Sequence, residues 1–350
     1  MEAGMVQIPI FRLPMKAQKL VISLVYFADI IELTTMSTKF HKLLKAVRLN
    51  VDEYKLIRLL GNAIIQLKCS MGNMVFEPDI YLKGNKRLIS GFPATIKSSG
   101  RRNCQVEFES GAFGNKTMSL EKITNHLFSF LNIQRFIVEL DRPENDTLSL
   151  KNLFIWKRVQ NFYEIRVSPS MHCPKITLSD EELCFFLGGV KFEKLYLDVQ
   201  STHHSKYRVT AKGKQVVFME SSWIEFNELT LGTSLESLKI QVDFQFPDRA
   251  INRILQEWMG GKHGQLEDFK IVAKRTKPGA DVMQDLNAIA SIFSIEQVNR
   301  RIGRGLSTRT SGDMDIRRPG DNRLATVVTM ENSLLVFFWH EKHFKEVGIV

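Results

Sequence analysis

The first fifty residues place apolar side chains at the three- and four-residue intervals that are typical of helices. Pro14 suits the first turn of one helix. Asp29 followed by Glu32 has the pattern of a capping box and predicts a second helix, and Ser37 can start a third. The apolar residues of these helices are Leu20, Val21, Leu24, Val25, Ile30, Ile31, Leu33, Phe40, Leu43, Leu44 and Val47. So small a bundle forms a poor core alone, and we therefore expect a partner to complete it.

The period of the apolar pattern then changes from helical spacing to alternation. Residues 64–70 alternate, residues 71–73 have the composition of a turn, and residues 74–76 resume the alternation, which predicts a hairpin. Residues 83–103 are rich in glycine and serine and are typical of a loop or linker. We therefore assign residues 51–103 to a hairpin and a linker.

The middle of the chain repeats one pattern, a helical stretch followed by a short strand. The strand-like segments begin 28, 31, 43 and 31 residues apart and cover residues 133–140, 161–167, 192–199, 235–242 and 266–273. Ser179 with Glu182 forms a capping box for one preceding helix. Asp248 is the expected cap of another, in which Trp258 falls in register with core positions.

The two best copies share the phrase Leu-Glu-x-(Leu/Phe)-Lys-Ile, at residues 235 and 266. A helix, a turn and a strand that recur at this spacing are typical of a stacked solenoid similar to leucine-rich repeats. An ordinary α/β domain with a chance internal resemblance is the alternative. If the solenoid is correct, its exposed strand face and adjoining loops are the expected binding surface.

The C-terminal pattern predicts an antiparallel meander of three strands, at residues 314–318, 324–329 and 334–339. Such a meander could cap the open edge of the preceding sheet. The fold class predicted for the whole chain is therefore α/β. It comprises a three-helix module (residues 8–50), the hairpin and linker, a repeat body (104–275) and a C-terminal loop with a β-meander cap (276–350).

Composition places the chain among folded proteins, because 44% of its 350 residues are hydrophobic. No apolar run reaches the length of a membrane span, and we interpret residues 20–28 as a buried helix rather than a signal peptide. The four cysteines, Cys69, Cys104, Cys173 and Cys184, form no C-x-x-C pair. We expect them to be reduced, buried thiols of an intracellular, cytoplasmic or nuclear protein that is not secreted.

Charge suggests one alternative function. Lysine and arginine outnumber aspartate and glutamate by 48 to 38, and residues 300–323 contain seven arginines and three aspartates. This segment could bind nucleic acid. A solvated loop is the favoured interpretation, because no aromatic residues alternate with the arginines.

The sequence contains no recognisable catalytic motif. It lacks a phosphate-binding P-loop, a dinucleotide fingerprint, a nucleophile elbow and an H-E-x-x-H zinc motif. We interpret the pair His340 and His343 as incidental, and Cys184 as part of an apolar helix face. The chain is therefore predicted to be a non-catalytic protein without cofactor or metal.

Two parts of the chain resemble known domains. Residues 8–50 resemble an F-box through Phe11-Arg12-Leu13-Pro14, Leu20-Val21, Leu24, residues 29–33, Ser37, Lys39 and Leu43-Leu44. Residues from about 175 to 330 are similar to a type-2 F-box-associated domain through residues 253–258, 265–271 and 315–318, Gly320 and residues 325–327. The tryptophan common late in F-boxes is absent, and Phe40-His41 stand near its place.

The resemblance implies the substrate-recognition subunit of a cullin-RING ubiquitin ligase. The F-box would bind a Skp-type adaptor and through it a cullin, and the C-terminal domain would bind an unknown target protein. By resemblance, the adaptor-binding set is Leu13, Pro14, Leu20, Val21, Leu24, Ile30, Ile31, Leu33, Leu43 and Leu44. Some of these residues must hold the helices together instead, and a generic three-helix cap is the alternative for the whole module.

Overall fold

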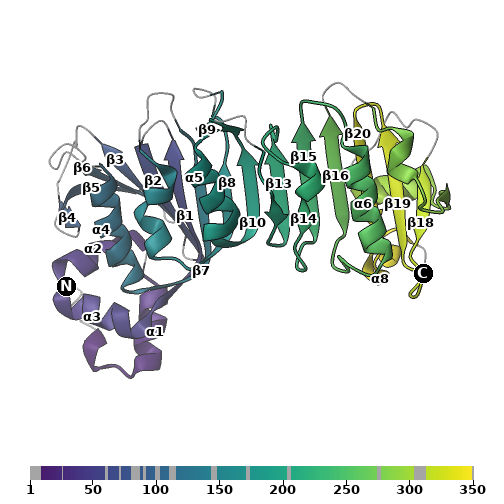
Figure 1. Ribbon diagram of the computed structural model, residues 1–350. Coiled ribbons are helices and arrows are strands. Elements are labelled where there is room, and N and C mark those ends of the chain that lie inside the picture. Colours follow the sequence, from purple (N-terminus) through teal and green to yellow (C-terminus); the bar gives the residue numbers. More distant parts are fainter. Residues whose placement is uncertain are drawn as a thin grey trace. The chain divides into compact units, whose positions relative to one another are not determined.

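The protein is an α/β protein with mixed β-sheet, and its chain divides into two compact units, Met1–Tyr163 and Glu164–Val350 (Figure 1). The computed structural model describes residues 9–25, 27–59, 62–70, 72–79, 87–89, 92–98, 103–109, 116–142, 148–170, 174–202, 206–273, 277–302 and 313–348. Among these residues, none of the helices has the length and apolar character that crossing a membrane requires.

Unit 1 begins with the three predicted helices, preceded by the 3₁₀ turn Ile10–Arg12. They are α1 (Met15–Ser23), α2 (Phe27–Met36) and α3 (Thr38–Val47). Ser37 is the N-cap of α3, since its hydroxyl accepts from the Phe40 amide at 3.2 Å. The prediction that Asp29 caps α2 is wrong, because the helix begins at Phe27. Asp29 instead lies in the first turn, where a negative charge is favourable to the helix dipole.

The sheet of unit 1 has the strand order β7-β1-β2-β3-β6-β5-β4. Its elements are β1 (Leu49–Leu59), β2 (Asn62–Cys69), β3 (Gly72–Asp79), β4 (Arg87–Ile89), β5 (Phe92–Ser98), β6 (Asn103–Glu109), α4 (Lys116–Phe128) and β7 (Leu131–Leu140). The pairs β1/β7 and β3/β6 are parallel, and the other neighbours are antiparallel. Helix α4 packs against this sheet, and Thr124 shares a 2.8 Å hydrogen bond with the buried hydroxyl of Tyr54.

The β2/β3 hairpin is confirmed, but the linker assignment is wrong for the described part of residues 51–103. Strand β1 occupies residues 49–59, and β4 and β5 occupy parts of the expected linker. Ala94 and Thr95 of β5 are buried, and β5 pairs with β6 through Ala94–Phe108 and the positions that follow. Pairing within the β5/β6 hairpin therefore outweighs the turn-like local composition.

Unit 2 is built on the parallel strands β10 (Lys191–Asp198), β13 (Gln215–Met219), β15 (Ser237–Val242) and β16 (Asp268–Ala273). Strand β8 (Asn161–Val167), which begins at the end of unit 1, lies next to β10. The chain between these strands forms α5 (Asp180–Cys184), a π-helical turn (Phe185–Gly189), a 3₁₀ turn (Phe226–Glu228) and α6 (Asp248–Met259). The short strands β9 (Thr177–Leu178) and β11 (Gln200–Ser201) pair with each other, as do β12 (Thr210–Ala211) and β14 (Thr230–Leu231).

The capping box of Ser179 and Glu182 at the start of α5 is confirmed. Asp248, by contrast, is the first residue of α6 rather than its cap, and its carboxylate accepts from the Gly279 amide at 3.0 Å. Strand β13 lies inside the interval of 43 residues that interrupted the predicted repeat. The parallel strands therefore recur at shorter intervals than the sequence pattern indicated.

The C-terminal meander is confirmed and continues the sheet of unit 2. It consists of β18 (Met314–Arg317), β19 (Leu324–Met330) and β20 (Ser333–Phe338), with β17 (Ile289–Ala290) beside β18. Strand β20 pairs antiparallel with β16, so the meander occupies the edge of the parallel strands. The last helices are α7 (Ile295–Ile302) and α8 (Glu341–Glu346), with a 3₁₀ turn at Ala280–Met283.

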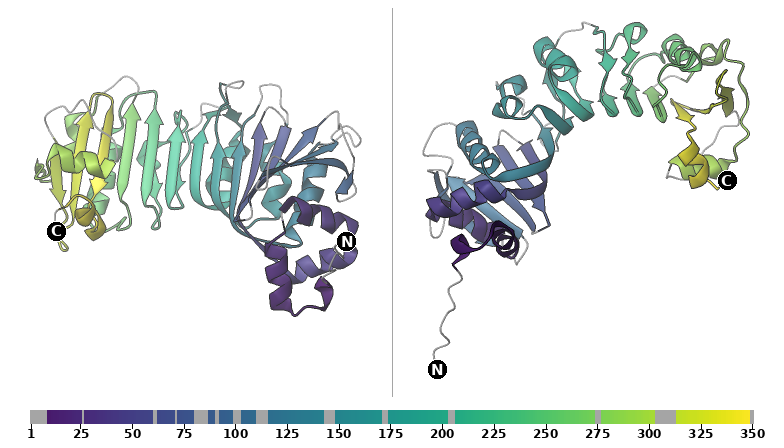
Figure 2. Two further views of the ribbon diagram at one scale, coloured as in Figure 1. Left: turned by 180° about the vertical axis from the view of Figure 1, so that it is seen from behind. Right: turned by 90° about the horizontal axis from the view of Figure 1, so that it is seen from below.

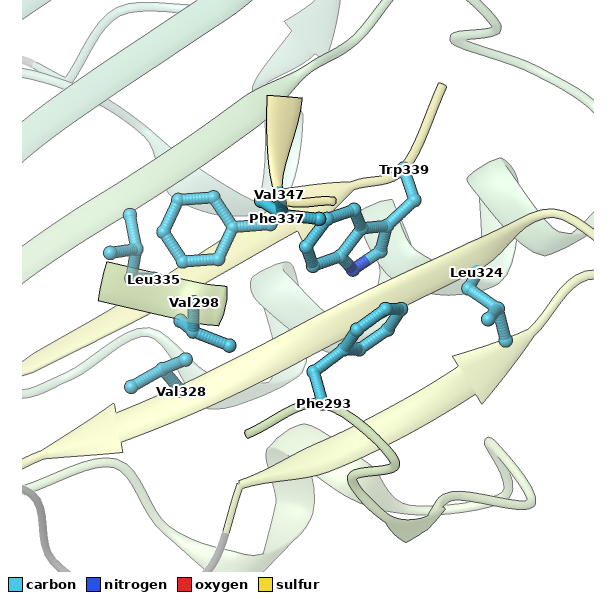
Figure 3. Close-up of a cluster of buried hydrophobic side chains, with 8 residues drawn as sticks. All are labelled: Phe293, Val298, Leu324, Val328, Leu335, Phe337, Trp339 and Val347. Carbon is cyan, nitrogen blue, oxygen red and sulfur yellow. The ribbon is translucent and has the colours of Figure 1, made fainter. Parts of the chain in front are cut away.

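A hydrophobic cluster joins α7, the meander and the C-terminal segment (Figure 3). The ring of Phe293 stacks on Trp339 at a centroid distance of 4.0 Å. The cluster contains Phe293, Val298, Leu324, Val328, Leu335, Phe337, Trp339 and Val347. On the other side of the sheet, Trp258 of α6 is buried, as predicted.

The cysteines divide between interior and surface. Cys69 is buried, as expected, but Cys184 is exposed, which corrects its assignment to an apolar helix face. Glu182, Leu183 and Phe186 are the buried positions of this helix and its π-helical continuation, and helical spacing places Cys184 on the opposite side. The side chains of Cys104 and Cys173 lie outside the described residues.

Candidate functional site

Exposed apolar side chains are concentrated in the N-terminal helices. Among the described residues, nine large hydrophobic side chains are exposed, and six of them lie between residues 11 and 36. We call these six the helical apolar surface: Phe11, Met15, Leu20, Leu24, Leu33 and Met36. Leu24 and Met36 are the most exposed, at 76% and 71%. Concentrated apolar exposure of this kind marks a surface that another molecule covers.

The structure separates the ten predicted adaptor-binding residues into an interior and an outer group. The four interior residues are Ile30, Ile31, Leu43 and Leu44. They hold α2 and α3 in place and cannot reach a partner in this conformation. The outer six are half-buried or exposed: Leu13, Pro14, Leu20, Val21, Leu24 and Leu33.

Helix α1 directs two of the outer leucines to one side. Leu20 and the C-cap residue Leu24 are four residues apart and so lie on one side, whereas the buried positions Gln18 and Ile22 face the unit. The Gln18 amide donates to the carbonyl of Leu13 at 2.8 Å and fixes the chain where it enters the helix. The outer leucines are therefore presented on an ordered element.

The prediction missed three members of the helical apolar surface, Phe11, Met15 and Met36. Phe11 belongs to the phrase Phe-Arg-Leu-Pro, so a signal for it was present in the sequence. The same helices carry exposed lysines: Lys16 and Lys19 on α1, and Lys39, Lys42 and Lys45 on α3. A partner that binds these helices would be expected to carry acidic groups.

Unit 2 contains a polar cavity of about 500 Å³ at the carboxyl ends of its parallel strands. Asp198, Glu220 and Asp243 follow or end three successive strands, and Lys175 supplies a positive charge. The remaining lining residues are Pro169, Pro174, Ile176, Val199 and Gln200. Within the described part of the chain, no three His, Cys, Asp or Glu residues are grouped closely enough to hold a metal ion.

The two C-terminal histidines have structural contacts. His343 is buried, its Nδ1 accepts from the amide of His340 at 3.2 Å, and its Nε2 lies 3.3 Å from a carboxylate oxygen of Glu267. Lys342 pairs with the same carboxylate, and His340 contacts the carbonyl of Leu266 at 2.8 Å. These contacts join α8 to the start of β16. The pair His203–His204 lies outside the described residues.

Several arginines of the 300–323 segment take part in the fold. Arg318 is buried, and its guanidinium lies 5.1 Å from the centre of the Trp258 ring. It also pairs with the carboxylate of Asp321 and holds the pKa of that group well below its usual range. Arg323 also pairs with Asp321, at 3.3 Å. Arg301 lies 3.8 Å from Glu267. Residues 303–312 lie outside the described residues, so the proposed nucleic-acid segment gains no support from its described part.

Comparison with known proteins gives no assignment. No protein-family model matches the chain, and neither a curated protein nor a solved structure matches it. The resemblance to an F-box and its associated domain therefore stays a prediction that depends on the residues quoted for it.

Proposed function

We propose that this protein is the substrate-recognition subunit of a cullin-RING ubiquitin ligase. The N-terminal helices would bind a Skp-type adaptor, and through it a cullin, while unit 2 would bind the target protein. Such a subunit catalyses no step itself. It brings a lysine of its target close to the charged conjugating enzyme, and high effective concentration accounts for the rate.

The observation that carries the proposal is the helical apolar surface. Leu20 of α1 and Leu24, the C-cap residue of the same helix, are 64% and 76% exposed, although both are large apolar residues of the F-box resemblance. Burial of a leucine side chain contributes about 1.5–3 kcal/mol to association. A protein that acted alone would gain nothing from exposing several such residues within one short segment.

The test measures binding of the purified full-length protein to a purified Skp-type adaptor by isothermal titration calorimetry. We expect the wild type to bind and Leu20→Ala/Leu24→Ala to bind at least tenfold more weakly, because the variant lacks two leucine side chains that the adaptor would bury. The matched control is Leu148→Ala/Ile289→Ala, which truncates two exposed apolar residues outside the helical apolar surface. The control should bind like the wild type.

Because Leu20 and Leu24 are exposed, their truncation should leave the melting temperature within about a degree or two of the wild-type value. Leu44→Ala, which leaves a cavity at a buried position, should lower the melting temperature markedly. A wild type that does not bind the adaptor would overturn the proposal. So would equal affinities for the wild type and the α1 double variant.

A further inference from the structure

Half of the protein's net positive charge lies in its N-terminal helices. The formal net charge of the whole chain is +10 at pH 7, and residues 10–48 contain seven lysines and arginines against two acidic residues. Both acidic residues, Asp29 and Glu32, belong to α2, so α1 and α3 contain none. A short segment with so much charge of one sign attracts an anionic partner.

The five lysines of α1 and α3 have no carboxylate partner within the described part of the chain. All five are exposed, and none forms an ion pair or a side-chain hydrogen bond with another described residue. Exposed lysines elsewhere do pair: Lys214 lies 2.9 Å from Glu193, and Lys342 lies 2.5 Å from Glu267. The positive charge of α1 and α3 is therefore available to another molecule.

Helix stability does not account for the positions of these lysines. Lys16 and Lys39 are the second residues of α1 and α3, and neither first turn contains an acidic residue. A positive charge in the first turn opposes the helix dipole, so both lysines cost some stability. Local departures from the most stable arrangement are expected where a surface serves binding. The proposed adaptor contacts use the leucines of α1 and give the lysines no role.

Lysines and leucines share the exposed side of α1. Lys16 and Leu20 are four residues apart, as are Leu20 and Leu24, and Lys19 is the neighbour of Leu20. The buried residues of this helix lie on its other side. Charge and apolar surface therefore lie next to each other on one helix.

Helix α3 adds a row of positive charge. Lys39, Lys42 and Lys45 follow one another at intervals of three residues, on the side opposite to the buried Phe40 and Leu44. Figure 2 (left) shows the N-terminal helices, in purple, projecting beyond the strands of unit 1, as α1 and α3 also do in Figure 1. A projecting helical surface can reach a flat partner.

The lysines decide between a protein and a lipid bilayer as the anionic partner. Interfaces between proteins are depleted of lysine and enriched in arginine, tyrosine and tryptophan. Lysines beside leucines are instead typical of helices that lie in the plane of a membrane surface. An anionic bilayer offers negative charge to the lysines and, just beneath the headgroups, hydrocarbon to the leucines.

We propose that α1 and α3 bind the surface of an anionic phospholipid bilayer, with their lysines at the headgroups and with Leu20 and Leu24 among the upper acyl chains. Attachment of this kind strengthens with both the apolar area buried and the attraction to anionic lipid. The binding itself does not depend on the proposed function. An adaptor would cover the same two leucines, so adaptor and membrane would exclude each other, and only this competition rests on the proposed function.

The test measures co-sedimentation of the full-length protein, without adaptor, with lipid vesicles. One set of vesicles contains equal parts of phosphatidylserine and phosphatidylcholine, and the other contains phosphatidylcholine alone. We expect at least tenfold tighter binding to the anionic vesicles, weakening as salt is raised. No binding to the anionic vesicles, or equal binding to both sets, would overturn the proposal.

The two informative charge variants are Lys16→Gln/Lys19→Gln in α1 and Lys39→Gln/Lys42→Gln in α3. Each should lose at least tenfold in affinity for the anionic vesicles. Each should also keep or raise its melting temperature, because a positive charge is removed from the first turn of its helix. Wild-type affinity in both variants would overturn the proposal.

The matched control is Lys212→Gln/Lys262→Gln, which removes the same charge from two exposed lysines of unit 2 and should bind like the wild type. Equal losses in the control and the helix variants would show a general charge effect and contradict the proposal. Leu20→Ala/Leu24→Ala should also lose at least tenfold, and wild-type affinity in this variant would contradict insertion of the leucines.

A soluble polyanion distinguishes a bilayer from other acidic partners. Polyglutamate should not displace the protein from the vesicles at equal total negative charge, because it offers no hydrocarbon to the leucines. Displacement would show a site for acidic polypeptides and contradict the proposal. A protein that binds the anionic vesicles but no adaptor would support this inference while overturning the proposed function.

Discussion

The imidazole rings of His41 in α3 and His126 in α4 stack face to face, with centroids 4.9 Å apart and planes inclined by 19°. Phe130 packs edge-on against both rings. The Thr34 hydroxyl donates to the carbonyl of Ile31, so its oxygen is free to accept from Nε2 of His126 at 3.1 Å. This arrangement is that of a neutral imidazole with its proton on Nε2. The stack joins the N-terminal helices to the rest of unit 1.

Both histidines resist protonation. Burial, together with the nearby His41 and Lys45, lowers the pKa of His126 from 6.5 to about 4. Burial and Lys45 also lower the pKa of His41. Nδ1 of His41 is buried without a hydrogen-bond partner among the residues that the structure describes, so a proton there would have no acceptor.

We therefore expect the protein to lose stability as the pH falls from about 6.5 to about 4. The unfolded chain binds a proton at His126 near pH 6.5, whereas the folded chain does so only near pH 4. The contribution of His126 to the free energy of unfolding is complete above pH 6.5 and falls by up to about 3 kcal/mol as the pH drops to about 4. Urea unfolding, followed by circular dichroism at several pH values, measures this free energy.

His126→Gln provides the comparison, because glutamine keeps an amide donor for Thr34 but does not titrate. Its free energy of unfolding should vary less with pH than that of the wild type over the same window. Parallel pH profiles for the two proteins would show that the stack does not carry this dependence.

Local chemistry accounts for the features that the sequence predicted well. Ser37 and Ser179 cap α3 and α5 because a hydroxyl satisfies an amide three residues ahead, a relationship contained within one helical turn. The β2/β3 hairpin likewise depends on residues that are neighbours in the chain. Trp258 was predicted as a core residue because it shares a helix face with Ile254 and Leu255.

Two features were missed for different reasons. Strand β5 exists through its pairing with β6, although its own residues resemble a linker. The exposure of Cys184 follows from helical spacing, because the buried residues Glu182, Leu183 and Phe186 lie on the opposite side of the helix.

The roles of the proposed adaptor-binding residues could not be predicted from local spacing. Helical spacing identified the apolar residues of α1 and α2, but packing decides that Ile30 is interior and Leu24 is exposed. In unit 2, the alignment of side chains across the strands could not be predicted, because it depends on the phase of each strand and on the position of β13.

A buried polar chain in unit 2 gives the next prediction. The Thr326 hydroxyl donates to the carboxylate of Asp315 at 2.6 Å and accepts from Nε1 of Trp339 at 2.8 Å. The Asp315 carboxylate also accepts from the backbone amide of Ile292 at 2.8 Å. Thr326→Val keeps the side-chain shape but leaves the indole donor without its acceptor. We expect a loss of about 1–3 kcal/mol in the free energy of unfolding, measured with urea.

Thr210→Val is the matched control for this substitution. Thr210 shares a hydrogen bond with Thr230, but its side chain is exposed, so water can replace the lost contact. The control should change stability by less than about 0.5 kcal/mol. A loss at Thr210 as large as the loss at Thr326 would contradict the role assigned to the buried chain.

Two glycines with nearly the same φ differ in their surroundings and give the last prediction. Gly213 and Gly261 have φ values of +88° and +87°, in the region that side chains disfavour. A Cβ at Gly261 would meet open space, whereas one at Gly213 would lie 2.9 Å from the backbone oxygen of Glu193 and 3.0 Å from the ring of Phe192. The same oxygen accepts from the amide of Lys214 at 2.7 Å, next to the point where β13 begins to pair with β10.

Gly261→Ala should therefore cost only the conformational penalty, about 1–2 kcal/mol. Gly213→Ala should cost clearly more, because relief of the clash requires movement of Glu193 and weakens the hydrogen bond to Lys214 at the start of the β10/β13 pair. Urea unfolding of the two variants side by side measures the difference. Equal losses would mean that the turn before β13 yields without disturbing β10, and that the alignment of β10 with β13 does not depend on this close approach.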